Sequence, residues 1–413
     1  MEISLRWGGT MPLARLFEEA IHHARHGHAV TASQSRCSDR DSGALADQPG
    51  FADRYLLEGH PPGVGQRVSQ PGLASLLERL AEAGLDDFYR GAIGHHLGAA
   101  LQKAGSPLTS ADLARHRSIR RRPLSLNVGG ATVYNLPPPS QGLAALMILG
   151  LFERLAVKEP DGFAHLHGIV EATKQAFLVC HANVTDPAYM TVHSTTYLGD
   201  SLLDRLASSI APKRALPWIS PANDHDTAWI GAIDGEGRAV SSIQSLGTPF
   251  GSGLAVGDFG LLWHNRGSAF ALEAEAKNHL APGRKPFHTL CPALARFRDG
   301  RVMVYGTSGG DGQPQTQAAI FTRYAFFGRD LQRAVTAPRW RLGAGGNAAQ
   351  SSLKMEARFD PALVDALREA GHDIALVDPF DPQMGQAGAV LRHDDGCLEG
   401  ATDPRSDGGV AGY

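Results

Sequence analysis

The stretch that decides the fold runs from residue 226 to residue 253 and reads DTAWIGAIDGEGRAVSSIQSLGTPFGSG. Its first apolar run, Ala228–Ile233, is followed by an Asp-Gly-Glu-Gly turn, and a second strand-like run covers Ala239–Leu246. Two such runs around a Gly-rich turn are typical of a β-hairpin. The stretch therefore predicts a hairpin with Thr227 at the start of its first strand.

Thr227 has a side chain that can act as a nucleophile under one condition. A Thr hydroxyl is a poor nucleophile at its own pKa, but a free α-amine on the same residue can serve as its base, because that amine titrates near neutral pH. Thr227 is internal, so it gains this amine only if the Asp226–Thr227 bond is cut. Taken alone, Thr227 is better explained as an ordinary β-branched strand residue.

The composition is ordinary for a soluble globular protein and excludes several classes of function. The chain has 413 residues, 43% hydrophobic and 20% charged, with a formal net charge of -3. That charge offers no basis for binding nucleic acid or an anionic membrane. The longest apolar run, Gly142–Phe152, is too short to span a bilayer, and the N-terminus lacks the apolar core of a signal peptide. We therefore expect a cytoplasmic enzyme.

Neither the cysteines nor the histidines have the spacing of a metal site. The four cysteines, Cys37, Cys180, Cys291 and Cys397, are too few and too scattered for a disulfide framework or a zinc site. The histidine-rich segment at residues 22–28 can be read as a metal site, but a solvated helix face fits its spacing better. The sequence therefore predicts no metal and no cofactor.

Apolar periodicity predicts mainly helices before Asp226 and mainly strands after it. Helices are expected at residues 11–25, 71–80, 88–101, 140–155, 163–177 and 315–327, and Ser201 and Asp204 resemble a capping box that opens a short helix. Strands are expected at residues 131–136, 254–263, 294–297, 302–305 and 389–391. Residues 36–49 are polar and predict a loop. Periodicity alone thus gives an α+β fold.

Seven short motifs, taken in order along the chain, resemble the gamma-glutamyltransferase family. Each is weak alone, but the ordered set makes chance a poor explanation. The motifs are NLPPPS (135–140), EATK (171–174), FGSG (250–253), APGRKP (281–286), GTSGG (306–310), APR (337–339) and GATDPR (400–405). The resemblance implies an α+β fold of a particular kind, the four-layer αββα sandwich of N-terminal nucleophile hydrolases.

The resemblance also implies that the chain is a precursor. Members of the family cut themselves before a catalytic Thr, and the two products stay together as one fold. Residues 1–226 would then form a large chain and residues 227–413 a small chain, with cleavage between Asp226 and Thr227. Thr227 would be the nucleophile. A homodimer of this processed heterodimer is compatible with the resemblance.

Three further residues match catalytic positions of the family. Ser245 lies where members place a second hydroxyl that hydrogen-bonds to the nucleophile, although it can also be a plain polar strand residue. Gly309 and Gly310 match the family's oxyanion hole, in which backbone N–H groups stabilise the tetrahedral intermediate. A lone Gly-Gly pair is otherwise just a turn.

The substrate-binding positions depart from those of glutamyl transferases. A Gln and an Asp that hold the substrate's α-amine correspond here to Arg266 and Ala269, and an Arg repels an ammonium group. The family's carboxylate-binding Ser pair corresponds to His288 and Thr289, and a helping Asn corresponds to Gly247. The glutamyl site is therefore largely rebuilt, unless Arg266 only forms a surface salt bridge.

A guanidinium can hold a carboxylate through two parallel hydrogen bonds, which favours a small acidic amide without an α-amine. The motifs DTAW (226–229), NRG (265–267), KPFHT (285–289) and GQPQTQ (312–317) resemble the branch of the family that hydrolyses oxamate to oxalate and ammonia. Asn265, Arg266, His288 and Thr289 are the expected substrate-binding residues. The alternatives are glutathione hydrolysis or glutamyl transfer with altered recognition, and an acylase for larger amides.

The N-terminus is a further departure. Family members carry a substantial segment ahead of the region that starts here near Arg6, and that segment supplies early strands, a Gly-rich stretch and a substrate-binding Arg. Its absence from this sequence favours a rival interpretation, in which the chain is a non-catalytic remnant that only binds. The Asp226-Thr227 and Gly309-Gly310 pairs argue against that interpretation.

Overall fold

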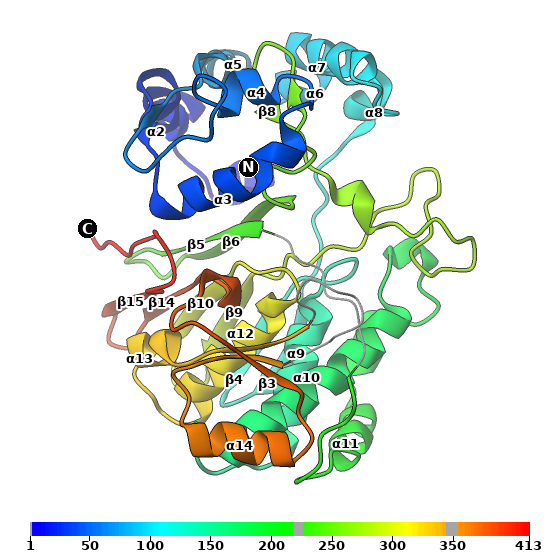
Figure 1. The fold of residues 1–413 in the computed structure, drawn as a ribbon, viewed down its shortest axis with the longest axis vertical. Helices are drawn as coiled ribbons and strands as arrows, with labels where there is room; N and C mark the ends of the chain where they lie inside the picture. Colours follow the sequence, from blue (N-terminus) through cyan, green and yellow to red (C-terminus); the bar gives the residue numbers. More distant parts are fainter. Residues whose placement is uncertain (1, 219–225, 344–352) are drawn as a thin grey trace. The chain divides into compact units, whose positions relative to one another are not determined.

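The computed structural model describes residues 2–218, 226–343 and 353–413. These residues form two compact units (Figure 1). The first unit contains Met1–Arg120 and Leu246–Asn265, and the second contains Arg121–Ser245 and Arg266–Tyr413. No helix among the described residues is long and apolar enough to cross a membrane.

The first unit is mainly helical. Its core forms where the apolar faces of α2 and α5 pack together and meet α7, and it includes Phe17, Leu76, Leu97 and Val256. The elements of this unit are α1 (Glu2–Trp7), α2 (Leu13–His26), β1 (His28–Ala29), α3 (Ala32–Leu45), α4 (Phe51–Tyr55), β2 (Arg67–Val68), α5 (Pro71–Ala83), α6 (Asp87–Arg90), α7 (Ala92–Lys103), α8 (Ser110–Arg115), β7 (Ala255–Val256) and β8 (Leu261–Leu262).

The second unit is built on a six-stranded antiparallel sheet with the order β15-β14-β10-β9-β4-β3. The strands are β3 (Leu124–Val128), β4 (Ala131–Asn135), β9 (Ala293–Phe297), β10 (Val302–Thr307), β14 (Ala387–Arg392) and β15 (Leu398–Thr402). Alternate residues point to opposite faces of a strand, so each strand supplies two layers. On β10, Met303 and Tyr305 join the main apolar core, and the intervening residues face the other way.

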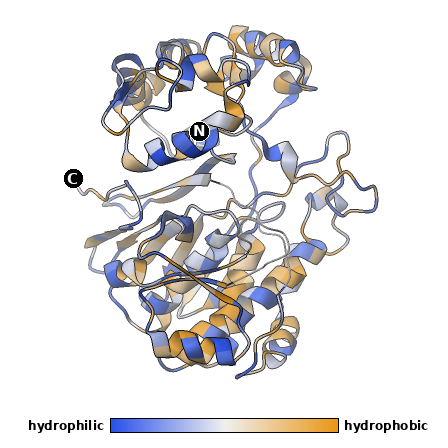
Figure 2. Ribbon diagram, viewed as in Figure 1, coloured by the Kyte–Doolittle hydropathy of each residue, from blue (hydrophilic) through white to orange (hydrophobic). Residues whose placement is uncertain are grey.

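Helices cover one face of this sheet. The central helices are α9 (Gly142–Arg154), α10 (Phe163–Asn183) and α12 (Gly312–Phe321), and α9 is buried along almost its whole length. Figure 2 shows apolar residues concentrated on these helices. Smaller elements complete the unit: α11 (Asp200–Ser208), η1 (Pro187–Tyr189), η2 (Ser194–Leu198), η3 (Arg266–Ala269), η4 (Thr322–Phe326), α13 (Leu331–Thr336), α14 (Pro361–Glu369), η5 (Pro382–Met384), and a sheet of β11 (Trp340–Leu342), β12 (Leu353–Glu356) and β13 (Ile374–Val377).

The predicted hairpin is confirmed and covers the opposite face of the six-stranded sheet. It consists of β5 (Asp226–Ile233) and β6 (Ala239–Gly247), and β5 lies against β10 and β14. A Cβ built on Gly231 of β5 would lie 3.1 Å from Cγ2 of Val304 on β10, so the two strands approach each other closely at this point. The second unit therefore has a helical layer, a six-stranded sheet and the hairpin in that order, which makes it an α+β sandwich.

Four local predictions were wrong. The strand expected at residues 254–263 is divided into β7 and β8, which pair with each other as antiparallel strands. Residues 36–49 are mostly helical, because α3 begins after Thr31, whose hydroxyl accepts the Gln34 N–H at 3.2 Å. The buried face of α3 is made of serines, so its sequence lacks apolar periodicity. The helix expected at residues 88–101 is broken at Gly91. The capping box expected at Ser201 does not form, since α11 starts at Asp200 without a side-chain cap.

Candidate active site

Trp229 fixes the position of β5 on the sheet. Gly306 and Gly388 are paired across β10 and β14, and a Cβ at either would lie 2.1 Å or 2.6 Å from the Trp229 indole. The indole therefore needs glycine at both positions, and its Nε1–H donates to the Ser241 hydroxyl at 2.9 Å. Because side chains two residues apart share a face of a strand, Thr227 faces the sheet as Trp229 does.

The register of the hairpin brings Ser245 toward Thr227. The Asp234 N–H donates to the Arg238 carbonyl at 3.1 Å, which closes the turn between β5 and β6. Counting back equally along both strands from this pair places Ser245 opposite Thr227, on the same face of the hairpin. This agrees with the expected neighbourhood of the two hydroxyl groups, and the catalytic role of Ser245 stays a prediction.

Gly309 and Gly310 form the turn between β10 and α12. Their φ angles are 104° and 52°, in the region that favours glycine. The carbonyls of these two glycines accept the first amides of α12, from Gly312 at 2.7 Å and Gln313 at 3.1 Å. Among the described residues, neither the Gly309 nor the Gly310 amide donates a hydrogen bond. Two such amides are a suitable donor set for an oxyanion.

Gln313, in the first turn of α12, contacts the expected nucleophile directly. Its Nε2 donates to Thr227 Oγ1 at 3.4 Å. This contact links Thr227 to the helix that follows the Gly309-Gly310 turn. Gln313 belongs to the GQPQTQ motif, but the sequence predicted no role for it. Its position three residues after Gly310 was the feature that could have indicated a place in the site.

The loop after β4 links the predicted residues His288 and Thr289 to the Gly309-Gly310 turn. The Gln141 N–H donates to the His288 carbonyl at 3.1 Å, and the His288 N–H donates to the Pro139 carbonyl at 3.0 Å. The Gln141 side chain in turn donates to Asp311 at 2.9 Å, directly after Gly310. The His288-Thr289 pair is thereby held beside the Gly309-Gly310 turn.

Arg266 and His288 interact electrostatically. Burial, and next the positive charge of Arg266, lower the pKa of His288 to about 4, so its imidazole is neutral at pH 7. Burial also lowers the pKa of the Arg266 guanidinium from its ordinary value. The structure thus brings a partly desolvated cation and a neutral imidazole together in the second unit.

Several polar atoms around His288 lack partners within the described part of the chain. They are His288 Nδ1, Thr289 Oγ1 and Gln141 Oε1. Thr289 has no exposed surface, and Gln141 is 2% exposed. Leaving a buried polar group without a hydrogen bond costs about 1–3 kcal/mol, so such atoms call for an explanation. A polar ligand would supply the missing partners.

For two predicted site residues, the described contacts give no evidence of a link to this arrangement. Asn265 belongs to the first unit, where its side-chain oxygen accepts the Thr248 N–H at 3.1 Å and its amide donates to the Thr248 hydroxyl at 2.8 Å. These bonds make Asn265 a brace within its own loop. Asp226 begins β5, and the stretch 219–225 before it lies outside the described residues. Substrate binding by Asn265 and cleavage after Asp226 stay predictions.

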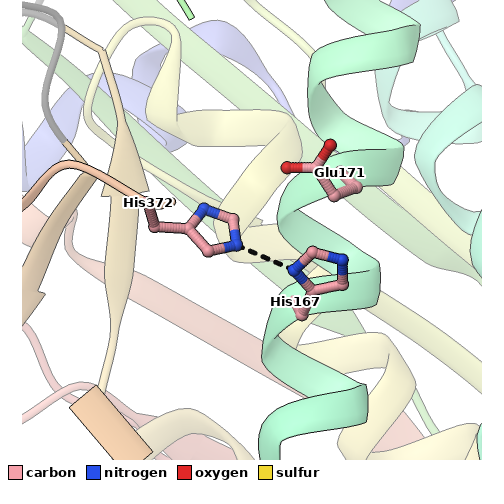
Figure 3. Close-up of side chains that lie close together, drawn as sticks. All are labelled: His167, Glu171 and His372. Carbon is pink, nitrogen blue, oxygen red and sulfur yellow. Dashed lines mark hydrogen bonds between the residues drawn. The ribbon is translucent and has the colours of Figure 1, made fainter. Parts of the chain in front are cut away.

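A second buried polar cluster resembles a metal site. His167, Glu171 and His372 bring three potential ligand atoms within 4.8 Å of one another. His167 and Glu171 lie one turn apart on α10, and His372 approaches from the segment after α14 (Figure 3). His167 Nδ1 and His372 Nε2 are 2.9 Å apart, within hydrogen-bond distance.

Nearby groups already satisfy this cluster. The Ala211 carbonyl lies 2.8 Å from His167 Nε2. Lys174 donates to one oxygen of Glu171 at 2.6 Å, and the Leu216 N–H donates to the other at 3.0 Å. The Lys174 ammonium therefore already supplies the positive charge beside Glu171. The arrangement is that of a structural cluster rather than of an open metal site.

Comparisons with known proteins agree with this architecture. The chain is 48% identical over 406 residues to an oxamate amidohydrolase proenzyme from Klebsiella pneumoniae, covering 98% of this chain and 77% of that protein. It is 38% identical to a glutathione hydrolase-like proenzyme from Bacillus subtilis, with the same coverage. Among solved structures, a cephalosporin acylase from Bacillus halodurans matches with a TM-score of 0.90 and 30% identity, over 99% of this chain and 76% of that one.

The family assignment follows from the sequence match across the whole chain. The sequence pattern that defines the family described as gamma-glutamyltranspeptidase matches residues 2–413. These relatives are hydrolases, and the expected α+β sandwich of N-terminal nucleophile hydrolases is confirmed by the structural match. The chain is therefore an enzyme, and it belongs to the gamma-glutamyltranspeptidase family.

Proposed function

We propose that this enzyme is a self-processing amidohydrolase for small amides that carry a carboxylate, with oxamate as its substrate. The observation that carries the proposal is the half-buried guanidinium of Arg266 beside the neutral imidazole of His288. The name of the 48% identical relative, an oxamate amidohydrolase, supports the same substrate. Oxamate has one carboxylate and one primary amide, and no α-amine.

The proposed first reaction is cleavage of the chain itself. Thr227 Oγ1 attacks the Asp226 carbonyl, and its proton passes to the amide nitrogen as the C–N bond breaks. The result is an ester with a free α-amine on Thr227. Water then hydrolyses the ester to give residues 1–226 and residues 227–413. The proenzyme names of the relatives support such a step and a heterodimer made from one precursor.

Turnover then uses the new amine as the base. The Thr227 amine accepts the hydroxyl proton while Oγ1 attacks the amide carbon of oxamate. The Gly309 and Gly310 amides, which have no other partner among the described residues, stabilise the oxyanion. The ammonium returns the proton to the leaving nitrogen, ammonia departs, and water hydrolyses the acyl-enzyme to oxalate. Ser245 would orient the nucleophile from the neighbouring strand.

Arg266 would select the substrate by charge. It would hold the oxamate carboxylate through paired hydrogen bonds, with His288 and Thr289 completing the contacts. An α-ammonium placed about 4 Å from the guanidinium would be repelled by about 4 kcal/mol at an effective dielectric constant of about 20. The same charge therefore disfavours γ-glutamyl substrates, whose α-amine lies beside their carboxylate.

Glutathione hydrolysis is the second candidate. It is favoured by the 38% identical relative, which is named as glutathione hydrolase-like. Under this candidate the α-amine would have to be held by groups other than Arg266.

A comparison of two substrates tests the proposal. We expect the processed protein to release ammonia from oxamate with a kcat/KM about 100-fold or more above that for a γ-glutamyl anilide, as a difference of about 3 kcal/mol requires. Arg266→Lys keeps the charge but loses the paired geometry, so its kcat/KM for oxamate should fall between those of the wild type and Arg266→Gln. Equal rates on both substrates, or a preference for the anilide, would reject the role of Arg266.

The proposed cleavage site does not coincide with the boundary between the two compact units, and the cysteines bear on the compartment. The two compact units do not divide at Thr227, since β5 and β6 both start in the second unit. Cleavage before Thr227 would therefore leave each unit built from both chains. None of the four cysteines forms a disulfide in the described part of the chain, which supports a reducing compartment such as the cytoplasm.

A further inference from the structure

The orientation of the Gln313 amide is determined by its neighbours. Its Oε1 accepts the Cys291 N–H at 3.3 Å and lies 3.5 Å from the Cys291 thiol. A backbone N–H can only donate, so the oxygen of the amide must face Cys291. The Nε2 then necessarily faces Thr227 Oγ1, 3.4 Å away. Gln313 is therefore a donor to Thr227 and cannot be its acceptor.

The side-chain amide of a second glutamine, Gln317, also holds Cys291 in place. Gln317, one turn later on α12, donates to the Cys291 carbonyl. Asn135, at the end of β4, donates to the Gln317 side-chain oxygen at 3.2 Å. Burial raises the pKa of the Cys291 thiol, so it stays protonated and does not compete with Thr227 as a nucleophile. The line of contacts runs from the six-stranded sheet through α12 to the hydroxyl of Thr227.

The surroundings strengthen this contact. Gln313 has no exposed surface, and Gln317 is 1% exposed. Hydrogen bonds in such a low-dielectric setting polarise one another and are stronger than in water. A bond to an oxygen that develops negative charge is about twice as strong as a neutral one. The benefit of this donor therefore grows as Thr227 loses its proton.

Gln315 shows what a purely structural glutamine looks like on the same helix. Its oxygen accepts the Leu342 N–H at 2.7 Å, and its nitrogen donates to the carbonyls of Asp311 at 2.9 Å and Leu342 at 2.8 Å. All its bonds go to the backbone, so it ties β11 to α12. Gln313 differs because its donor is directed at a side-chain hydroxyl.

We propose that Gln313 is a catalytic residue that activates Thr227 by donating a hydrogen bond to Oγ1. By occupying one acceptor position it turns the hydroxyl proton away from α12, toward the base. It also stabilises the oxygen as its proton leaves, both in self-cleavage and in turnover. The inference rests on the proposed role of Thr227 as the nucleophile.

Gln313→Glu provides the test, because it keeps the shape and the acceptor for Cys291 but removes the donor at neutral pH. Self-cleavage needs no substrate, so its half-time can be followed by intact mass whatever the substrate proves to be. We expect Gln313→Glu to process about tenfold or more slowly at pH 8, as for the loss of one charge-assisted hydrogen bond. Below the pKa of the introduced carboxyl group its O–H is again a donor. The processing rate of Gln313→Glu should therefore be closer to the wild-type rate at pH 5 than at pH 8.

Two controls separate the possible outcomes. Thr322→Val removes a buried hydroxyl that donates to the Ala318 carbonyl at 2.8 Å, and it should lower the Tm while leaving the processing rate unchanged. Thr227→Ala should not process at all. Processing of Gln313→Glu at the wild-type rate, or a slow rate that does not recover at pH 5, would overturn the role of Gln313. Processing of Thr227→Ala would instead overturn the proposed function itself.

Discussion

Two buried polar clusters in the second unit differ in how completely their hydrogen bonds are made. The first consists of His167, Glu171 and His372, which Figure 3 shows, together with Lys174, and it will be called the closed cluster. The second consists of Gln141, His288 and Thr289, and it will be called the open cluster. In the closed cluster both oxygens of Glu171 accept hydrogen bonds and both ring nitrogens of His167 have partners. In the open cluster each residue has one polar atom without a partner among the described residues.

The difference shows that burial and a shifted pKa do not by themselves mark an active site. The pKa of His372 falls to about 3 and that of His288 to about 4, in each case chiefly because burial disfavours the charged ring. Judged by burial and pKa alone, both histidines would be candidate active-site residues. The completeness of hydrogen bonding separates them, because a saturated cluster stabilises the fold and an unsaturated one has bonds left for a ligand.

The partners of the closed cluster indicate its structural role. Most of them are backbone groups of the segment that leads toward Thr227: Ala211 is bonded to His167, and Leu216 is bonded to both Glu171 and Lys174. Ala215 of the same segment donates to the Ala370 carbonyl at 2.7 Å. The closed cluster therefore fastens residues 211–216 to α10 and α14.

The largest expected effect comes from breaking the closed cluster. Lys174→Met leaves the Glu171 carboxylate buried without its ion-pair partner and removes a donor to Leu216, so the free energy of unfolding should fall by about 3–5 kcal/mol. Urea denaturation measures this change. Protein that remains folded should keep its kcat/KM for oxamate. A decrease in the free energy of unfolding below about 1 kcal/mol would contradict the structural role of the closed cluster. A kcat/KM that falls while stability is unchanged would show that the closed cluster has a functional role.

Removing the cation beside the open cluster should weaken substrate binding more than it weakens stability. Arg266→Gln removes a charge that is partly desolvated, and the KM for oxamate should rise about 10- to 100-fold, as expected for losing 1.5–3 kcal/mol of charge-assisted bonding. The Tm should fall less than it does for Lys174→Met. Steady-state kinetics and a thermal melt on the same sample check both statements. An unchanged KM would mean that the carboxylate is held elsewhere.

Thr289→Val tests the open cluster with a smaller change. The substitution removes a buried hydroxyl without a partner among the described residues and keeps the side-chain shape, so the Tm should rise while the KM for oxamate increases about tenfold or less. Thr322→Val is the matched control, since it removes a satisfied hydroxyl and should lower the Tm. A drop in Tm for both variants would show that the Thr289 hydroxyl is already bonded in the folded protein.

The smallest effect is a dependence on pH that both clusters share. Because the folded-state pKa of His288 and of His372 lies below the ordinary value, unfolding takes up protons in acid. Their contribution to stability is complete above about pH 6.5 and is lost as the pH falls toward 4 for His288 and 3 for His372. We expect each histidine to contribute a loss of about 1 kcal/mol at pH 5.5. His372→Gln should reduce this slope; an unchanged slope in chemical denaturation would contradict the assignment. The KM for oxamate should not change between pH 6 and 8 through titration of His288.

Local features of the fold could be predicted from the sequence, and contacts between distant segments could not. The hairpin that carries Thr227 follows from its Gly-rich turn and from the apolar runs on either side of it. The turn at Gly309 and Gly310 was expected from its glycines, and its role as an oxyanion hole was inferred from the family resemblance. Helix α3 was missed, because its buried face is built from serines that give no apolar period.

The contacts that define both clusters join residues far apart in the sequence. Gln313 reaches Thr227 across 86 positions, and His167 meets His372 across 205. No periodicity or spacing rule relates such residues, since the sheet order and the packing of α10 and α12 bring them together. Of the open cluster, His288 and Thr289 could be named only through resemblance to a family, and Gln141 was not predicted. The polar atoms without partners became visible only in the structure.

The central claim is that Thr227 is the nucleophile of a self-processing enzyme, and an intact-mass spectrum tests it most directly. The purified protein would be incubated at neutral pH beside Thr227→Ala. The account predicts two fragments in the wild type, the smaller beginning Thr-Ala-Trp and ending at Tyr413, and a single uncut chain in the variant. An uncut wild type, or a variant that is cut at the same bond, would contradict it.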